Sequence, residues 1–206
     1  MLEERGAPAW ETLKRYVKTA WPAFDWDAAY EGFIAELTPL YSVDPLAPSR
    51  ALEMLACRFV ESDTATFYRT LSTLSPEPVL KQVTSRMSAD EVRHYKHFCR
   101  YYLRYKEIEK PRRAALLRML WARSSEIDTE DLVYAVKHIL RMRNPGIRWQ
   151  RSEYEAVRDA GFRMMRDHYP FPMAAKMLLR PLGFGAVTAR CVILVAATSA
   201  RFFLMR

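Results

Sequence analysis

Apolar residues recur at intervals of three and four along most of the chain, which is the period of an amphipathic α-helix. Runs of Val, Ile and Thr are few and the chain has only 6 glycines, so a sheet with tight hairpins is not expected. Proline and glycine divide the pattern into separate segments. Helices are predicted over 10–20, 25–37, 49–74 and 76–109, then in 111–144, 152–170 and 173–206.

Three of these predictions depend on local signals. Asp25 or Asp27 caps the second helix and Ser49 caps the third. The stretch 111–144 is either one helix or two, because Ser124-Ser125 and the cap-like sequence from Asp128 offer a break before Asn144-Pro145-Gly146 ends the segment. The stretch 173–206 is expected to form two helices that separate at 181–185.

Four long helices with short connections predict an all-α fold. We expect a ferritin-like up-down four-helix bundle over about 49–171, N-terminal helices within 9–38, C-terminal helices within 173–206, and a single domain over 1–206. A length of 206 residues suits one hydrophobic core.

Charge and cysteine content indicate which partners and which cellular compartment to expect. The chain has 32 Lys and Arg against 24 Asp and Glu, a net charge of +8 that favours an acidic partner. Its 3 cysteines form no Cys-x-x-Cys pair and read as reduced core residues. The charged first residues do not resemble a signal peptide, and the longest apolar run, 191–200, is too short to span a membrane. A cytoplasmic protein is expected.

Two acidic residues and a histidine interrupt apolar stripes where a core residue is expected. Glu91 and His94 lie three apart on one face of the helix 76–109, and Glu61 occupies the core row of the preceding helix. Glu61 lies 15 residues before Pro76 and Glu91 lies 15 after it, so an antiparallel pair brings both to one level. Buried carboxylates need a counter-charge, which a metal ion supplies. The alternative is a pair neutralised by Arg58 or Arg93, or a stripe that turns towards water.

The segments Arg58 to Glu61 and Asp90 to His94 resemble the first half of the motif of ferritin-like di-iron carboxylate proteins, such as rubrerythrins and ferritin-like hydroxylases. The resemblance implies iron as cofactor, with two ions expected and one as the alternative. By the same resemblance Glu61 is a terminal carboxylate, Glu91 a bridging carboxylate and His94 a nitrogen ligand. A di-iron oxidase or oxygenase that activates dioxygen is the function it implies.

The second half of that motif is not repeated, because no other Glu-x-x-His occurs in the chain. Counted from Lys110, Glu126 lies 16 residues after the turn and His94 lies 16 before it, so Glu126 reaches the metal level if the helix is continuous. Glu130 competes with it one turn later, and His168 is the candidate nitrogen ligand on the helix 152–170. Acidic residues in a first turn are also favoured by the helix dipole, and His168 also suits a helix C-terminus. His138, between Lys137 and Arg141, is expected at the surface.

Other functions and partners stay open from the sequence. One alternative is a helical binding protein with one metal or none, which has lost half of the site; another is a basic scaffold that binds RNA or a membrane. The segment from Arg141 to Arg151 is either a solvated face or a phosphate-binding stretch with Trp149 for stacking. The apolar tail 185–206 covers the bundle, pairs with a second copy in a homo-oligomer, or lies on a membrane surface. For the enzyme, dioxygen and an acidic or carrier-bound substrate are the expected partners.

Overall fold

The chain is all-helical wherever its structure is described. The computed structural model describes residues 7–40, 47–125, 130–144, 146 and 148–183, and these contain no strand. The predicted all-α class is therefore confirmed. The helices are α1 (Ala7–Ala20), α2 (Trp26–Leu37), α3 (Arg50–Leu74), α4 (Pro78–Glu109), α5 (Arg113–Ser125), α6 (Glu130–Arg143), α7 (Arg151–Arg166) and α8 (Phe171–Leu179), with short 3-10 turns η2 (Thr38–Leu40) and η3 (Arg180–Leu182).

Side-chain caps explain where the helices begin. The Asp25 carboxylate accepts a hydrogen bond from the backbone N–H of Ala28 at 3.0 Å, which decides between the two predicted caps of α2. Ser49 caps α3 as predicted, accepting from the N–H of Leu52 at 3.4 Å. Glu77 caps α4 and Pro78 occupies its first turn, so the chain reverses sharply between α3 and α4.

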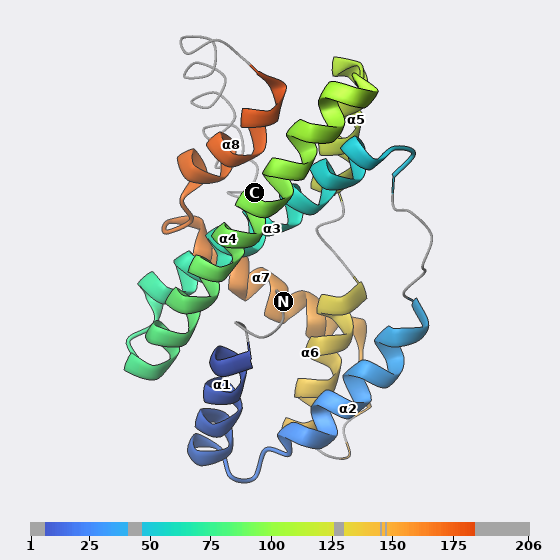
Figure 1. Ribbon diagram of the computed structural model, residues 1–206. Helices are drawn as coiled ribbons and strands as arrows, with labels where there is room; N and C mark the ends of the chain where they lie inside the picture. The colour runs from blue at the N-terminus through green and yellow to red at the C-terminus, as the bar shows by residue number, and fades with distance from the viewer. Residues whose placement is uncertain (1–6, 41–46, 126–129, 145, 147, 184–206) are drawn as a thin grey trace.

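The antiparallel pair of α3 and α4 is the longest feature of the molecule (Figure 1). Two hydrogen bonds tie the helices together at different heights. The Ser88 hydroxyl donates to the carbonyl of Ala65 at 2.8 Å, and the N–H of Ala51 donates to the Glu109 carboxylate at 2.9 Å. These ties fix the register of α3 against α4, and the register decides which side chains meet between them.

A hydrophobic core joins this pair to α5 and to the end of α8. Both α5 and α8 pack against α3. Buried residues of the core are contributed by α3, α4, α5 and η3, among them Leu55, Tyr102, Leu116 and Leu182. The Tyr169 hydroxyl lies 2.7 Å from the hydroxyl of Thr66, which fastens the start of α8 to the middle of α3.

Of the remaining helices, α2, α6 and α7 form a second group, whereas α1 packs mainly against the α3–α4 pair. The helix α6 lies against α2 and α7, and α1 contacts α4 (Figure 1). Lys137 of α6 donates to the Glu36 carboxylate of α2 at 2.7 Å. The specific four-helix bundle over 49–171 is therefore not confirmed, because α6 pairs with the N-terminal helix α2, which the prediction had placed outside the bundle.

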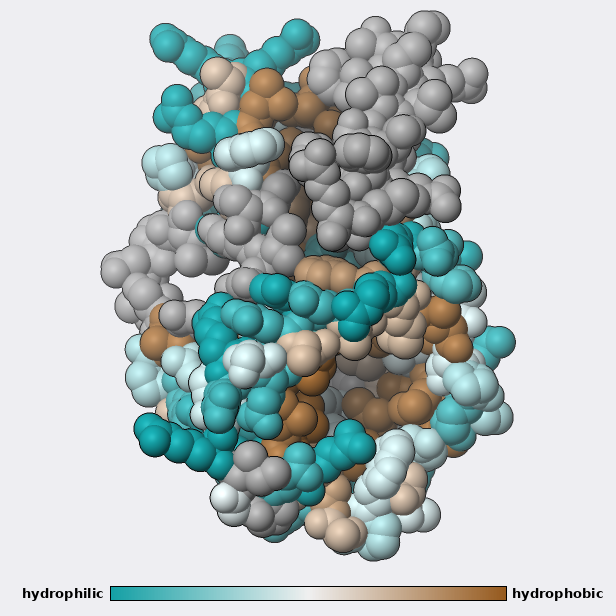
Figure 2. Space-filling view, turned by 180° about the vertical axis from the view of Figure 1, so that it is seen from behind, coloured by the Kyte–Doolittle hydropathy of each residue, from teal (hydrophilic) through white to brown (hydrophobic). Residues whose placement is uncertain are grey.

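The two open questions on helix boundaries receive different answers. The stretch 111–144 forms two helices, α5 and α6, which separate at the predicted break. The helix α8 and the turn η3 account for 171–182, whereas the second predicted C-terminal helix lies outside the described residues. In the described part of the chain, no helix combines the length and the apolar character needed to cross a bilayer. On the face of the molecule opposite to that of Figure 1, apolar and hydrophilic patches alternate, and the lower half of this surface is hollowed (Figure 2).

Candidate metal centre

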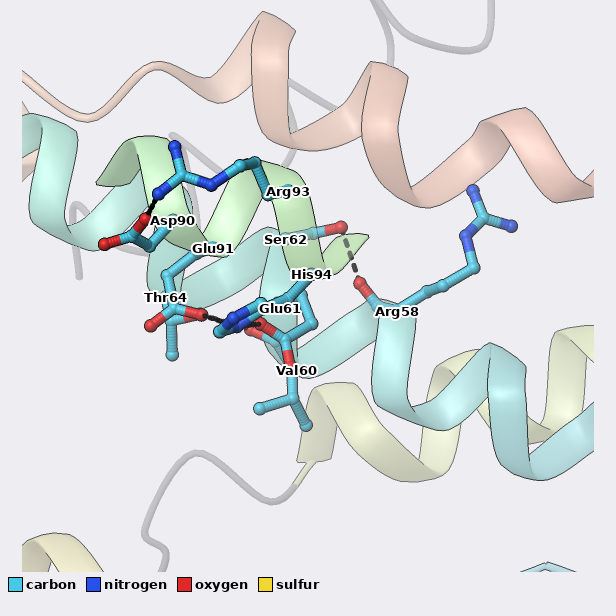
Figure 3. A network of polar contacts seen from close by, with 9 residues as sticks. All are labelled: Arg58, Val60, Glu61, Ser62, Thr64, Asp90, Glu91, Arg93 and His94. Carbon is cyan, nitrogen blue, oxygen red and sulfur yellow. Dashed lines mark hydrogen bonds and ion pairs between the residues drawn. The ribbon is translucent and has the colours of Figure 1, made fainter. Parts of the chain in front are cut away.

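Three predicted ligands come together on the α3–α4 pair. Glu61 is on α3, whereas Glu91 and His94 lie three residues apart on α4. One ligand atom from each of the three side chains lies within 4.8 Å of the other two. Figure 3 shows Glu61 and Glu91 reaching the His94 ring from the two neighbouring helices. The equal residue count on either side of Pro76 thus led to the right pairing of these positions.

The distances describe a compact cluster of oxygen and nitrogen donors. The Nδ1 atom of His94 lies 3.1 Å from a Glu91 carboxylate oxygen and 3.4 Å from a Glu61 carboxylate oxygen. The Glu91 contact is within hydrogen-bonding distance, and its partner is three residues away on the same helix. Both carboxylates, one from each helix, therefore face the same ring nitrogen of His94.

The cluster is largely removed from water. The side chains of Glu61, Glu91 and His94 are 16%, 19% and 27% exposed. Burial, the hydrogen bond to Glu91 and the negative charge of Glu91 together raise the pKa of Glu61 to about 8, with burial as the largest cause. Burial and the Glu91 charge also raise the pKa of the Tyr68 hydroxyl, so this phenol belongs to the same electrostatic environment.

Neither of the two arginines proposed as alternative counter-charges faces the carboxylate pair. Arg58 is 2% exposed and donates to the Tyr95 hydroxyl at 2.7 Å, with its guanidinium against the rings of Tyr95 and Tyr102. Figure 3 shows the Arg58 guanidinium pointing away from Glu61. Arg93 pairs with its neighbour Asp90. The negative charge of the Glu61–Glu91 pair is thus not compensated by the two cations expected from the sequence.

Of the other three predicted ligands, the structure describes the side chain of His168 alone, and it lies apart from this cluster. His168 follows the end of α7, is exposed, and is not part of the group. Glu130 begins α6, which packs against α2 and α7, and its side chain is outside the described part of the structure. Glu126 also lies outside the described residues.

The C-terminal end of α5 nevertheless approaches the cluster. Burial and the charges of Glu53 and Glu61 raise the pKa of the Cys57 thiol, and the positive charge of Arg123 on α5 opposes them. Arg123 therefore lies near α3 one turn before Glu61. In the sequence, Glu126 follows directly after the last residue of α5.

Two contacts, one near the cluster and one between α6 and α2, were not anticipated from the sequence. Tyr169 also donates to the Asp63 carboxylate at 3.1 Å, so α8 is fastened two residues after Glu61 in α3. His138, expected at the surface, is buried and its ring lies close to Gly32 of α2. Both contacts join residues about one hundred positions apart, and no local pattern signals them.

The donor set of the cluster fits a divalent transition metal. Carboxylate oxygens and an imidazole nitrogen are ligands that iron accepts, and two carboxylates supply the charge that balances a divalent cation. No family model, no curated protein and no solved structure matches this chain. The ferritin-like character of the site therefore remains a resemblance carried by the residues of α3 and α4.

Proposed function

We propose that Glu61, Glu91 and His94 bind iron and that the protein is an oxidoreductase of the ferritin-like di-iron type, which uses dioxygen. The observation that supports this proposal is the meeting of three ligand atoms within 4.8 Å, from two helices, at a largely buried position. Two carboxylates held together in such a place repel each other, and a cation between them removes that repulsion. The raised pKa of Glu61 is the expected signature of a pair without its cation.

Each ligand has a distinct part in the proposed site. Glu61 and Glu91 come from different helices, so a metal held between them also links α3 to α4. His94 contributes a neutral donor, and its Nδ1 atom faces both carboxylates. Bound iron would supply the electron-transfer and dioxygen chemistry. Three protein ligands leave coordination positions open for small molecules.

The number of ions depends on residues beyond the described cluster. The three ligands of α3 and α4 would be sufficient for one ion, and the resemblance to di-iron proteins implies that Glu91 would bridge to a second. Of the remaining candidates, Glu126 directly follows the end of α5 that approaches α3. An acidic or carrier-bound substrate is proposed from the net charge of +8.

Iron binding by matched variants tests this proposal. Purified protein is loaded anaerobically with Fe(II), separated from free iron, and analysed by plasma mass spectrometry. We expect about one to two irons per chain in the wild type, because the cluster would hold one ion and a bridging Glu91 would allow a second. Glu91→Gln keeps the shape of the side chain and removes its charge, so iron content should fall to background. Glu107→Gln makes the same change at an exposed position of α4 and should leave iron content unchanged.

Dioxygen consumption by the loaded protein tests the oxidoreductase part of the proposal. The wild type and Glu107→Gln are expected to consume dioxygen when a reductant is present, and Glu91→Gln is not. Absence of iron from the wild type would favour the metal-free binding protein instead. Equal iron content in both variants would show that the cluster is not the site.

A further inference from the structure

The corner between α6 and α7 concentrates positive charge. The segment 141–151 contains Arg141, Arg143, Arg148 and Arg151 and no acidic residue, which gives it half of the net charge of +8 in 11 residues. It includes the end of α6 and the first residue of α7. All four arginines are exposed. We call these four residues the basic corner.

The acidic residues around the basic corner are already engaged. Glu36 accepts from Lys137 at 2.7 Å and lies 3.9 Å from Arg141. The Glu153 carboxylate accepts from the backbone N–H of Gln150 at 3.1 Å, where it completes the cap of α7. Within the described part of the chain, Arg143 and Arg148 form no ion pair. Two guanidinium groups are therefore available to an external anion.

Local helix electrostatics explain only half of the basic corner. Arg141 and Arg143 lie in the last turn of α6, where the helix dipole favours a cation. Arg148 and Arg151 lie at the start of α7, where the dipole is positive and disfavours a cation. Arg151 is offset by Glu155 at 3.9 Å and by the Tyr154 ring beneath its guanidinium, whereas Arg148 forms no ion pair in the described part of the chain. A residue such as Arg148, which opposes the local preference without a structural gain, commonly marks a functional surface.

The surroundings of the arginines favour an extended partner over a small molecule. Leu140, Arg141, Asn144, Trp149 and Glu153 line a depression that is too closely packed to enclose a ligand. Asn144 and Gln150 are exposed in the same segment, and the half-buried Trp149 directly precedes Gln150. Guanidinium groups pair with phosphates through two parallel hydrogen bonds, amides pair with base edges, and aromatic rings stack on bases.

We propose that the basic corner binds single-stranded RNA through its phosphates. The observations favour RNA over a membrane surface, because membrane-bound basic residues are typically spread along an amphipathic helix with an opposite apolar face. Here they gather at the turn between two helices and consist of arginine alone. This inference is independent of the metal centre, which lies on α3 and α4.

Fluorescence anisotropy with a labelled single-stranded RNA of about 20 nucleotides tests the proposal. The double variant Arg143→Ala/Arg148→Ala should weaken RNA binding by about 10- to 30-fold at about 0.1 M salt. It should also reduce the steepness of log K against log salt concentration by about 1.4, because each of the two lost phosphate contacts accounts for about 0.7 on a single strand. The control Lys81→Ala/Arg86→Ala removes the same charge from exposed positions of α4 and should change neither the affinity nor the slope beyond a small general effect.

Several results would overturn the proposal. Absence of RNA binding by the wild type at low salt would do so, and so would equal weakening by the two double variants. Vesicles containing about 30% phosphatidylserine provide the membrane comparison. If the wild type binds these vesicles and not the RNA, and Arg143→Ala/Arg148→Ala abolishes that binding, the surface is a membrane contact instead. Circular dichroism of both variants confirms that they are folded.

Discussion

Replacing Glu61 by glutamine should change the stability of the protein in opposite directions with and without metal. Glutamine has the shape of glutamate and can still hydrogen-bond to Glu91, but it carries no charge. In the metal-free protein the substitution removes the repulsion between two carboxylates, so it should be stabilising. In the metal-loaded protein it removes a ligand, so it should be destabilising. A residue that only supports the fold would not show this reversal.

The size of the metal-free effect follows from the Glu61 pKa. Raising a carboxyl pKa from 4.5 to about 8 corresponds to a ceiling of about 5 kcal/mol, at about 1.4 kcal/mol per pH unit. The Glu61 side chain retains 16% exposure and water screens part of the repulsion, so we expect about 1 to 2 kcal/mol. A ligand at one hundred times its Kd stabilises the folded protein by about 2.7 kcal/mol, so we expect a stabilisation of similar size when metal is added to the wild type.

The pH dependence has a defined sign. Between pH 4.5 and about 8 the folded protein holds a proton on Glu61 that the unfolded chain releases, so the free energy of unfolding of the metal-free protein falls as pH rises through this range. Glu61→Gln should flatten this part of the profile. The difference in the free energy of unfolding between Glu61→Gln and the wild type should therefore be near zero at about pH 4.5 and largest above about pH 8.

Urea unfolding followed by circular dichroism measures both effects. Wild type, Glu61→Gln and the surface control Glu107→Gln are compared with a chelator at pH 5 and pH 9, and with Fe(II) under anaerobic conditions at pH 7.5. The reasoning is refuted if Glu61→Gln is less stable than the wild type at pH 9 without metal. It is equally refuted if Fe(II) stabilises both proteins to the same extent.

Two further substitutions test packing between distant segments. Gly32→Ala would place a Cβ atom 2.6 Å from the buried His138 ring, so it should lower the free energy of unfolding by about 1 to 3 kcal/mol in thermal unfolding. At Gly161 an added Cβ meets nothing within 4 Å, so Gly161→Ala should stabilise α7 by about 0.5 to 1 kcal/mol. Equal effects of the two substitutions would disprove the close contact at Gly32. Tyr169→Phe removes the hydroxyl that bonds to Thr66 and Asp63, so it should cost about 1 to 2 kcal/mol and speed hydrogen exchange in α8, and unchanged exchange would contradict the proposed tie.

The features that the sequence predicted well are those set by nearby residues. Caps such as Asp25 and Ser49 and the proline pair around Glu77 act within one turn, so the helix boundaries could be predicted from them. The meeting of Glu61 with Glu91 depends on a single tight reversal between two long helices. Counting residues from that reversal is enough to predict equal height, because the helical rise is constant.

The features that could not be predicted depend on pairing between distant segments. The docking of α6 on α2 rests on a salt link between Glu36 and Lys137 and on the absence of a side chain at Gly32, and neither signal identifies its partner in the sequence. The expected bundle assumed that consecutive helices pack in order. The helix α5 instead ends at Ser125, and the next helix, α6, packs against α2 and α7.

The buried guanidinium of Arg58 has a consequence for the direction of the electric field inside the α3–α4 pair. Its guanidinium places a buried positive charge against Tyr95 and Tyr102, while Glu61 and Glu91 bring two acids together at another point of the same helix pair. A cation that enters the pair would be attracted by the two acids and repelled by Arg58. This uneven distribution of charge is built into α3 and α4 themselves, and it would direct the proposed cation towards Glu61 and Glu91.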